Sequence, residues 1–194
     1  MSVSGALRLA DAPRDLLVLR CQEGDLQAFG SLYDLYHRDV FRVVARILGR
    51  DADISDIAQA AFVEISRSIH RFDGRSSIRT WIFGVVANLA CKHIRKAVRR
   101  RRAMRGLEDL PPRSPTRPDE AYERAEAMRI LEHSLDELDP KRRVTFVLCA
   151  IEGLSPEDAA SALAVPVGTV YRRLSEARAH LRAALAEATG RDAR

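Results

Sequence analysis

The sequence predicts an all-α protein: two small helical domains joined by a proline-rich linker, with a helix-turn-helix in the second. Apolar residues recur every three or four positions along most of the 194 residues, which is the spacing of an amphipathic helix. No segment has the alternating apolar pattern of a β-strand. Four of the eight prolines lie within residues 111–118, where they remove backbone donors and disfavour helix. This proline-rich segment therefore divides the predicted helices into two domains.

The first domain is predicted over residues 13–103, after a flexible N-terminus at residues 1–12. A short helix ends near Gly24, and Asp25 and Gly49 have the residue types that cap and end the long helix between them. Three aromatic residues in that helix have helical spacing and are expected to be mostly core residues: Phe29, Tyr33 and Tyr36.

A third helix is expected from about residue 54 to residue 70, with an apolar stripe that includes Phe62 on its buried face. Its other face carries acidic and amide side chains: Asp53, Asp56, Gln59 and Glu64. From the residues alone, this face suits either solvent or a partner that is not DNA.

A polar turn follows, and it leads into the fourth helix. The turn consists of six residues: Phe72, Asp73, Gly74, Arg75, Ser76 and Ser77. Gly74 permits a left-handed backbone there, and Ser77 is expected to cap the helix. An apolar stripe over residues 78–89 marks the buried face, and Trp81 and Asn88 lie off that stripe.

The end of the fourth helix carries cations and no acidic residue: Lys92, Arg95, Lys96, Arg99, Arg100, Arg101, Arg102 and Arg105. Cations bind phosphates, a flat ring stacks on bases and an amide bonds base edges, so this helix favours nucleic-acid binding. Cations also stabilise a helix C-terminus through the macrodipole, but this run exceeds what a cap requires.

The linker is predicted over residues 104–119, the second domain over residues 120–188 and a flexible C-terminus over residues 189–194. Within the second domain, Asp139 and Ser155 are each followed by proline, which is a helix-start signal.

The last two helices have the spacing of a helix-turn-helix, whose second helix enters the major groove. The first of them ends near Ala164, where a left-handed backbone would cost alanine roughly 1 kcal/mol. The second carries polar and basic side chains off its apolar stripe: Tyr171, Arg172, Arg173, Ser175, Arg178 and Arg182. The alternative is a helical hairpin with a charged outer face; the clustered arginines favour DNA binding.

Charge and cysteine content favour a cytoplasmic protein without direct membrane insertion. The formal net charge is +5, no apolar run approaches the roughly 20 residues of a membrane span, and the N-terminus lacks the apolar core of a signal peptide. Cys21, Cys91 and Cys149 are too widely spaced for a disulfide framework, so we expect buried thiols. Cys91 and His93 have no matching ligand pair elsewhere, and neither a metal nor a cofactor is expected.

Between Asp15 and Leu185 the chain resembles the extracytoplasmic-function class of bacterial sigma factors, in which a −10-reading domain, a linker and a −35-reading domain follow one another. Four segments carry the resemblance: DLQAFGSLYDLYHRDVFRVVARILG at 25–49, DIAQAAF at 56–62, IRTWIFGVVANLACKHIRK at 78–96 and LSPEDAASALAVPVGTVYRRLSEAR at 154–178. Each motif is weak by itself, whereas four in order around a proline-rich tether are specific.

The resemblance implies a protein that binds RNA polymerase core and directs promoter-specific initiation, reading −35 duplex and capturing melted −10 DNA. It implies docking on the polymerase clamp coiled coil by Asp53, Asp56, Gln59 and Phe62. It implies contacts with −10 DNA by Phe72, Asp73, Gly74, Arg75, Ser76, Ser77, Trp81, Asn88, Arg95, Lys96 and Arg99. It implies contacts with −35 DNA by Thr169, Tyr171, Arg172, Arg173, Ser175 and Arg178. The implied partners are the polymerase core, through its clamp coiled coil and flap, promoter DNA and an anti-sigma protein.

Four positions depart from the family pattern. Ala60 and Ser66 stand where the family has glutamate and tryptophan, and Tyr171 and Glu176 replace positions that are often basic. The departures at Ala60 and Ser66 bear on the detail of docking on the polymerase and not on its existence. A carboxylate beside DNA repels phosphate but accepts a hydrogen bond from a cytosine amino group, so Tyr171 and Glu176 predict an unusual −35 sequence.

Two other function classes compete with this interpretation. A stand-alone helix-turn-helix regulator with an N-terminal sensor or interaction domain would bind its operator tightly without polymerase. An enzyme is not expected, because glycine-rich phosphate loops, metal-ligand spacings and nucleophile–base arrangements are missing from the sequence.

Overall fold

The computed structural model describes residues 12–49, 53–104 and 133–191, and every regular element among these residues is helical. The first module, up to residue 104, contains α1 (Ala12–Gln22), α2 (Leu26–Leu48), α3 (Ile54–Ser68), the 3₁₀ turn η1 (Ile69–Arg71) and α4 (Ile78–Met104). The second module, residues 133–191, contains a helical turn at 133–137, α6 (Pro140–Phe146), the π-helical turn η2 (Val147–Ile151), α7 (Pro156–Leu163) and α8 (Val167–Arg191). The predicted all-α class is confirmed.

The predicted helix-start signals act as caps. The Asp25 carboxylate accepts hydrogen bonds from the backbone N–H groups of Gln27 and Ala28, which lowers the pKa of Asp25. The Ser155 hydroxyl accepts from the N–H of Asp158 in the same way at the start of α7. These caps fix the beginnings of α2 and α7, because each satisfies backbone donors that the helix leaves unpaired.

Helix ends also match the sequence. Gly49 ends α2 with a φ of 66°, and Gly74 has a φ of 73° in the turn before α4. Ala164 is left-handed at the end of α7, with a φ of 50°, and it is the only non-glycine residue with positive φ in the described part of the chain. The predicted strain at Ala164 is therefore present.

Two helix boundaries were predicted wrongly. The helix expected to continue to residue 70 ends at Ser68 and tightens into the 3₁₀ turn η1. In the second module the sequence predicts one helix over residues 141–152. α6 instead ends at Phe146, and the chain continues as the wider π turn η2, in which the N–H of Glu152 bonds the carbonyl of Val147. The predicted linker, residues 104–119, lies outside the described residues except for residue 104. Most of the two predicted flexible termini also lie outside them, and so does most of a helix that the sequence predicts over residues 120–137.

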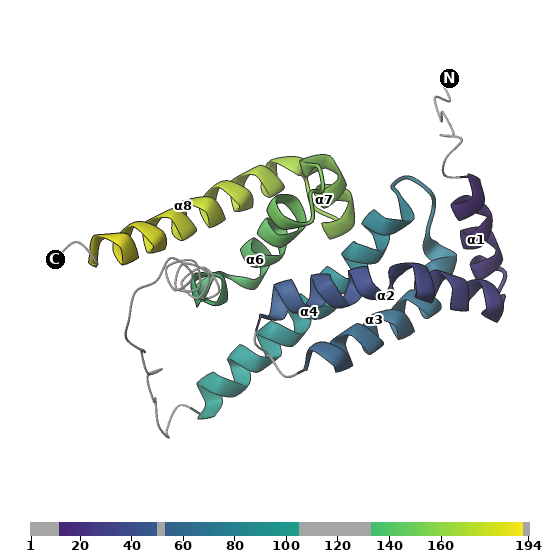
Figure 1. Cartoon of the computed structure of the whole chain (residues 1–194), viewed down its shortest axis with the longest axis horizontal. Helices are drawn as coiled ribbons and strands as arrows, with labels where there is room; N and C mark the ends of the chain where they lie inside the picture. The colour runs from purple at the N-terminus through teal and green to yellow at the C-terminus, as the bar shows by residue number, and fades with distance from the viewer. Residues whose placement is uncertain (1–11, 50–52, 105–132, 192–194) are drawn as a thin grey trace, which may run out of the picture.

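Helix α4 of the first module packs against the other helices of that module and also against the second module (Figure 1). α2 and α3 cover it within the first module, and α7 packs on it from the second. Its buried residues are accordingly more numerous than the predicted stripe: Ile78, Ile82, Phe83, Val86, Ala87, Ala90 and Cys91. Val85 and Leu89 of that stripe are only partly buried.

One hydrophobic core continues from the first module into the second. It includes Val40, Val43 and Ile47 of α2 together with Val144 and Val147 of the second module. A separate small cluster lies within the second module and consists of Leu135, Leu138, Ala177 and Leu181. The modules that the sequence separates are thus joined by shared apolar contacts.

Candidate nucleic-acid and polymerase interfaces

The turn before α4 presents a short polar loop. Asp73 accepts a hydrogen bond from the N–H of Arg75 and pairs with its guanidinium at 3.2 Å, and both side chains are exposed. Gln22 of α1 fastens the base of the loop by donating hydrogen bonds to the carbonyls of Ile69 and Phe72. The loop is therefore anchored at one end and open to solvent at its tip. The sequence did not single out Gln22, because its partners are about fifty residues away.

An aromatic pair joins this loop to α4. The rings of Phe72 and Trp81 meet edge to face with centroids 5.8 Å apart, and both side chains are partly buried. The Ser77 hydroxyl accepts from the N–H of Thr80 and so caps α4 as predicted. A partly exposed indole at the root of a polar loop is suited to stacking with a flat base.

Three of the predicted −10 residues fall on one line of α4. Trp81, Asn88 and Arg95 are separated by seven residues, or nearly two helical turns, so they share one side of the helix. Asn88 and Arg95 are exposed, and so are Lys96 and Arg99. Within the described part of the chain, none of these three cations is paired with a carboxylate. An uncompensated cationic row beside an exposed amide suits a phosphate backbone.

The helix-turn-helix places most of the predicted −35 residues on the open side of α8. Tyr171, Arg172, Ser175 and Arg178 are exposed, whereas Thr169 is partly buried. Three further polar residues adjoin this face. Glu176 pairs with Arg142 at 2.9 Å and with Arg172 at 3.2 Å, and the Tyr171 hydroxyl lies 3.4 Å from Glu157. The Glu176 carboxylate, which departs from the family pattern, is thus balanced by two guanidinium groups.

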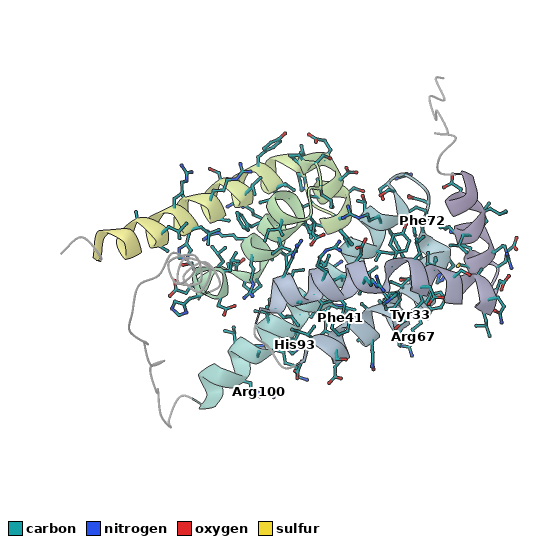
Figure 2. All side chains as sticks on the ribbon, in the orientation of Figure 1. Tyr33, Phe41, Arg67, Phe72, His93 and Arg100 are labelled. Carbon is teal, nitrogen blue, oxygen red and sulfur yellow. The ribbon has the colours of Figure 1, made fainter. Side chains whose placement is uncertain are left out.

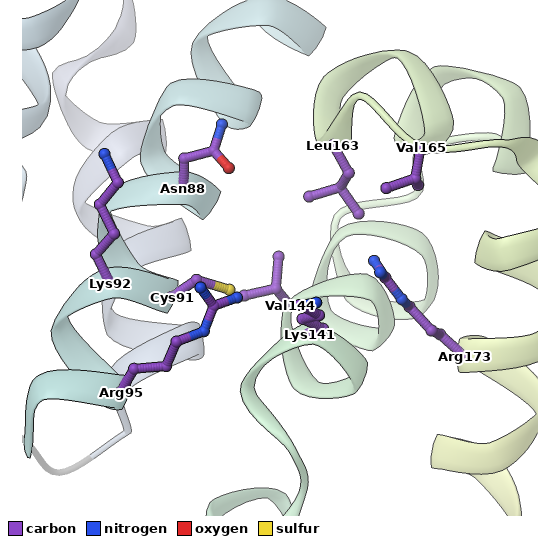
Figure 3. A pocket seen from close by; sticks show the side chains of 9 residues that line it. All are labelled: Asn88, Cys91, Lys92, Arg95, Lys141, Val144, Leu163, Val165 and Arg173. Carbon is purple, nitrogen blue, oxygen red and sulfur yellow. The ribbon is translucent and has the colours of Figure 1, made fainter. Parts of the chain in front are cut away.

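Arg173 lies apart from the other −35 residues. It is partly buried and lines a cavity of about 180 Å³ between the modules. Figure 3 shows Asn88, Cys91, Lys92 and Arg95 of α4 on one wall, with the guanidinium of Arg173 pointing in from α8. Val144, Leu163, Val165 and Lys141 complete the lining. Two predicted −10 residues, Asn88 and Arg95, and one predicted −35 residue, Arg173, therefore face the same small cavity.

The predicted docking face on α3 is only partly exposed. Asp56 and Gln59 are open to solvent, and Asp53 lies 3.7 Å from His93 of α4. Phe62 is buried under Tyr33, with ring centroids 4.6 Å apart. Direct contact of a partner with Phe62 would need Tyr33 to move.

Exposed apolar side chains adjoin this face, and the sequence prediction did not include them. Tyr33 is 45% exposed and Val63 of α3 is 48% exposed. Figure 2 labels Tyr33 and Phe41, which is 47% exposed, along α2. Tyr33 also stacks on His37, which fixes its ring at the surface. Helical spacing had indicated core positions for the three α2 aromatics, and of these only Tyr36 is fully buried.

The cysteines are free thiols. Cys21 and Cys91 are buried and Cys149 is partly buried, and burial raises the pKa of all three. No cluster of three or more metal-ligating side chains occurs among the described residues. None of the helices in the described ranges has the length and apolar character needed to cross a bilayer.

Two family models match the chain, one on each module. Sigma-70 region 2 matches residues 32–100, and Sigma-70 region 4 matches residues 128–181. The first match covers α2 to α4 and the loop, and the second covers the helix-turn-helix.

Curated relatives match across both modules. The chain is 32% identical to the ECF RNA polymerase sigma-E factor of Haemophilus influenzae, over 84% of this chain and 89% of that protein. It is also 32% identical to the ECF RNA polymerase sigma factor SigE of Mycolicibacterium smegmatis, of which it spans 65% of the length. A similar match, at 29% identity, is the ECF RNA polymerase sigma factor SigW of Bacillus subtilis, over 85% of this chain and 92% of that protein.

Solved structures have the same fold. CnrH, solved in complex with the cytosolic domain of CnrY, aligns with a TM-score of 0.61 and 26% identity, over 89% of this chain and 96% of that one. The sigma factor RpoE of Bartonella quintana, solved with the anti-sigma factor NepR, aligns with a TM-score of 0.62 and 20% identity, over 82% of this chain and 98% of that one. With a relative at 32% identity across most of both chains and both sigma regions in order, this protein belongs to the ECF family of RNA polymerase sigma factors.

Proposed function

We propose that this chain binds RNA polymerase core and directs promoter-specific initiation, reading −35 duplex with the second module and capturing melted −10 DNA with the first. One observation carries the proposal. The region 2 match covers the module with the exposed loop and cationic α4, and the region 4 match covers the helix-turn-helix. The chain contributes recognition, and the chemistry of RNA synthesis belongs to the polymerase.

The first module is suited to holding a base that has left the stack. The loop of residues 72–77 begins at Phe72, whose ring meets Trp81 of α4, and this pair offers an aromatic surface for an extruded base. Extrusion costs a few kcal/mol, and stacking together with hydrogen bonds to the base edge offsets that cost. Asn88 is exposed on the same side of α4 and can supply such bonds. Capture of the open strand shifts the duplex toward melting by mass action, without ATP.

The second module is suited to duplex DNA. Arg172, Ser175 and Arg178 are exposed on α8, the helix that the motif inserts in the major groove. Arginine donates two hydrogen bonds to the guanine edge, which fixes sequence, and it also neutralises phosphate. Because Glu176 is paired with Arg142 and Arg172, its charge is balanced and need not repel the DNA backbone.

The face of α3 with Asp56 and Gln59 is the proposed polymerase contact, bordered by the exposed Tyr33 and Val63. An apolar rim beside acidic and amide groups suits a protein partner better than it suits DNA, because phosphates repel carboxylates and aromatic residues are enriched in protein interfaces. Replacement of Asp56 by Arg reverses the charge of an exposed group and should weaken core binding at least tenfold in a competition assay. Glu23→Arg, at an exposed position just after α1, is the matched charge-reversal control, and equal effects of both would contradict a specific role for Asp56.

Two tethered modules gain affinity through effective concentration once both contact one polymerase. Neither module then needs tight binding by itself, which a stand-alone regulator would need. An anti-sigma protein is a further partner that we propose from family membership.

The decisive experiment is multi-round transcription from a genomic fragment library with purified core polymerase, with and without the full chain. New start sites that share two separated motifs are the expected result. A protein that yields no start site but footprints DNA by itself would contradict the proposal and would favour a stand-alone regulator.

A further inference from the structure

The cavity of about 180 Å³ between the two modules is lined by four cations, and no carboxylate of the described residues lines it. Lys92 and Arg95 belong to α4, Lys141 to α6 and Arg173 to α8. Within residues 12–49, 53–104 and 133–191, none of these four side chains pairs with a carboxylate. The cavity is therefore positively charged on both of its sides, and nothing in the described chain compensates that charge.

The cations converge on one place. In Figure 3 the guanidinium groups of Arg95 and Arg173 point toward each other from opposite walls, and Cys91 lies between them. Burial raises the pKa of the Cys91 thiol, and Arg95, Arg173 and Lys141 each act against that rise. Cations from three helices thus lie close to one sulfur atom.

The carboxylates nearby are bound to other partners. Asp139 is the one acid among the described residues that acts on the Cys91 pKa, which it raises. Its side chain caps α6 by accepting a hydrogen bond from the backbone N–H of Lys141, and it does not line the cavity. Glu176 of α8 pairs with two other arginines, Arg142 and Arg172. Neither acid is available to neutralise the cavity.

This set of side chains matches a phosphate group. An arginine fork donates two parallel hydrogen bonds to phosphate oxygens, and a lysine ammonium adds a compact charge. The exposed amide of Asn88 lines the same cavity and can donate as well. Because like charges brought together repel one another, an anion at this point would both bind them and remove their repulsion.

The volume limits the ligand. A water molecule takes up about 30 Å³ in the liquid, so a cavity of about 180 Å³ has room for one tetrahedral oxyanion or for two linked ones. Sites that enclose a drug-sized ligand usually have about 300–1,000 Å³, which is more than this cavity offers. A nucleotide could place its terminal phosphates inside only if its base and sugar stayed outside.

We infer that the cavity is a binding site for the phosphate groups of a small anion, held from both modules by Arg95, Lys141 and Arg173. The anion is inorganic pyrophosphate or the phosphate end of a nucleotide. Since it contacts both modules, its binding stabilises the contact between them. The site goes beyond the proposed function, because Lys141 is not among the residues expected to contact DNA.

Binding is measured by titrating inorganic pyrophosphate into the full chain in a calorimeter, without divalent cations and in about 0.15 M potassium chloride, which screens weak surface attraction. Wild type should bind with a Kd below about 1 mM. Lys141→Gln keeps the backbone N–H that Asp139 bonds, so α6 should keep its cap while binding weakens at least about fivefold. Lys96→Gln is the matched control, since Lys96 is exposed on α4 outside the lining, and it should change the Kd less than about twofold.

A second pair of variants tests the other wall. Arg173→Gln should weaken pyrophosphate binding at least about tenfold, because a bidentate donor is lost. Arg182→Gln, at an exposed position of the same helix outside the cavity, is its control and should change the Kd little. Equal losses in the cavity variants and in their controls would mean that overall charge alone attracts the anion, and would overturn the inference.

Cys91 shows whether the anion occupies the cavity. A bound anion blocks access to this thiol and offsets the cations beside it, so alkylation of Cys91 by iodoacetamide should slow at least about threefold at saturating pyrophosphate. Cys21 is buried in the first module away from the cavity and should keep its rate. The two rates are resolved by peptide mass spectrometry, and a Cys91 rate unchanged by bound pyrophosphate would place the anion elsewhere and overturn the site.

Competition distinguishes the two sources of the phosphate group. Displacement of pyrophosphate by ATP, with the same dependence on Lys141, would assign the site to the phosphate end of a nucleotide, whereas failure of ATP to compete would assign it to the inorganic anion. Absence of pyrophosphate binding by the wild-type chain would overturn both assignments. A chain that directs transcription but binds no pyrophosphate contradicts the anion site alone, and a chain that binds pyrophosphate but yields no start sites contradicts the proposed function alone.

Discussion

Replacement of Glu152 by glutamine should weaken the contact between the modules by about 2 kcal/mol. Breaking a buried ion pair costs about 3–5 kcal/mol, and an exposed pair contributes about 0.2–1 kcal/mol. The Glu152 side chain of the second module is 2% exposed, and it pairs with Arg42, Arg46 and Arg79 of the first module. These three arginines are 38–40% exposed, so solvent screens their side of the contact and an intermediate value applies. Glutamine keeps the shape and one acceptor but loses the charge. A loss of 2 kcal/mol corresponds to about a thirtyfold smaller ratio of chains with the modules in contact to chains with the modules apart.

Urea unfolding of the full chain, followed by circular dichroism, measures this effect. The apolar core is continuous between the two modules, so the modules of the wild-type protein should unfold together. Glu152→Gln should lower the urea concentration at the midpoint of unfolding, or divide the single transition into two. Glu64→Gln is the control, since Glu64 is exposed on α3 and such surface changes stay within about 0.5 kcal/mol. Identical unfolding curves for the two variants would refute the assignment of Glu152 as the main polar contact between the two modules.

Three further predictions concern single residues. Ala164→Gly should stabilise the protein by about 0.5–1 kcal/mol, because it relieves a left-handed alanine at φ 50°; an unchanged or lower urea midpoint would contradict this. Asn88→Ala should reduce opening of a supercoiled promoter while core binding is retained, and unchanged permanganate reactivity of the −10 region would remove Asn88 from the capture site. Arg173→Ala should weaken −35 binding by about 1–3 kcal/mol if it reads a base edge when the modules are apart, and a footprint indifferent to the change would exclude that role.

Local features of the fold were predictable because their causes lie within a few residues. The caps at Asp25 and Ser155 depend on a side chain and backbone donors two or three positions away, so residue type alone identifies them. Ala164 was identified in the same way, from the turn that follows it. The apolar stripe expected in the last helix was mostly correct: Val170, Leu174, Ala177 and Leu181 are buried. Leu185, its fifth member, is only partly buried.

Features that depend on distant contacts were missed. The π turn η2 has no local residue pattern by which the sequence could predict it. Glu152, which follows η2, bonds arginines more than a hundred residues earlier, so its partners could not be predicted from its neighbours in the sequence either. Helical spacing indicated Tyr33 as a core residue because the spacing shows on which face of the helix a side chain lies. It does not show how much of that face the neighbouring helices bury. The candidate site residues were predicted from the resemblance to the family. That Phe62 is buried and that Arg173 lines the cavity between the modules could be seen only in the structure.

The charges where the two modules meet act in opposite directions. At one end Glu152 attracts three arginines, while around the cavity four cations face one another: Lys92, Arg95, Lys141 and Arg173. None of these four is paired with a carboxylate in the described part of the chain, so their mutual repulsion opposes the contact between the modules, and a bound phosphate would remove it. The contact therefore depends mainly on Glu152 and on Gly84, where an added Cβ would come 2.4 Å from the carbonyl oxygen of Ala162. Neither residue is among the predicted DNA-reading residues, so the contact between the modules and DNA recognition can be changed by separate substitutions.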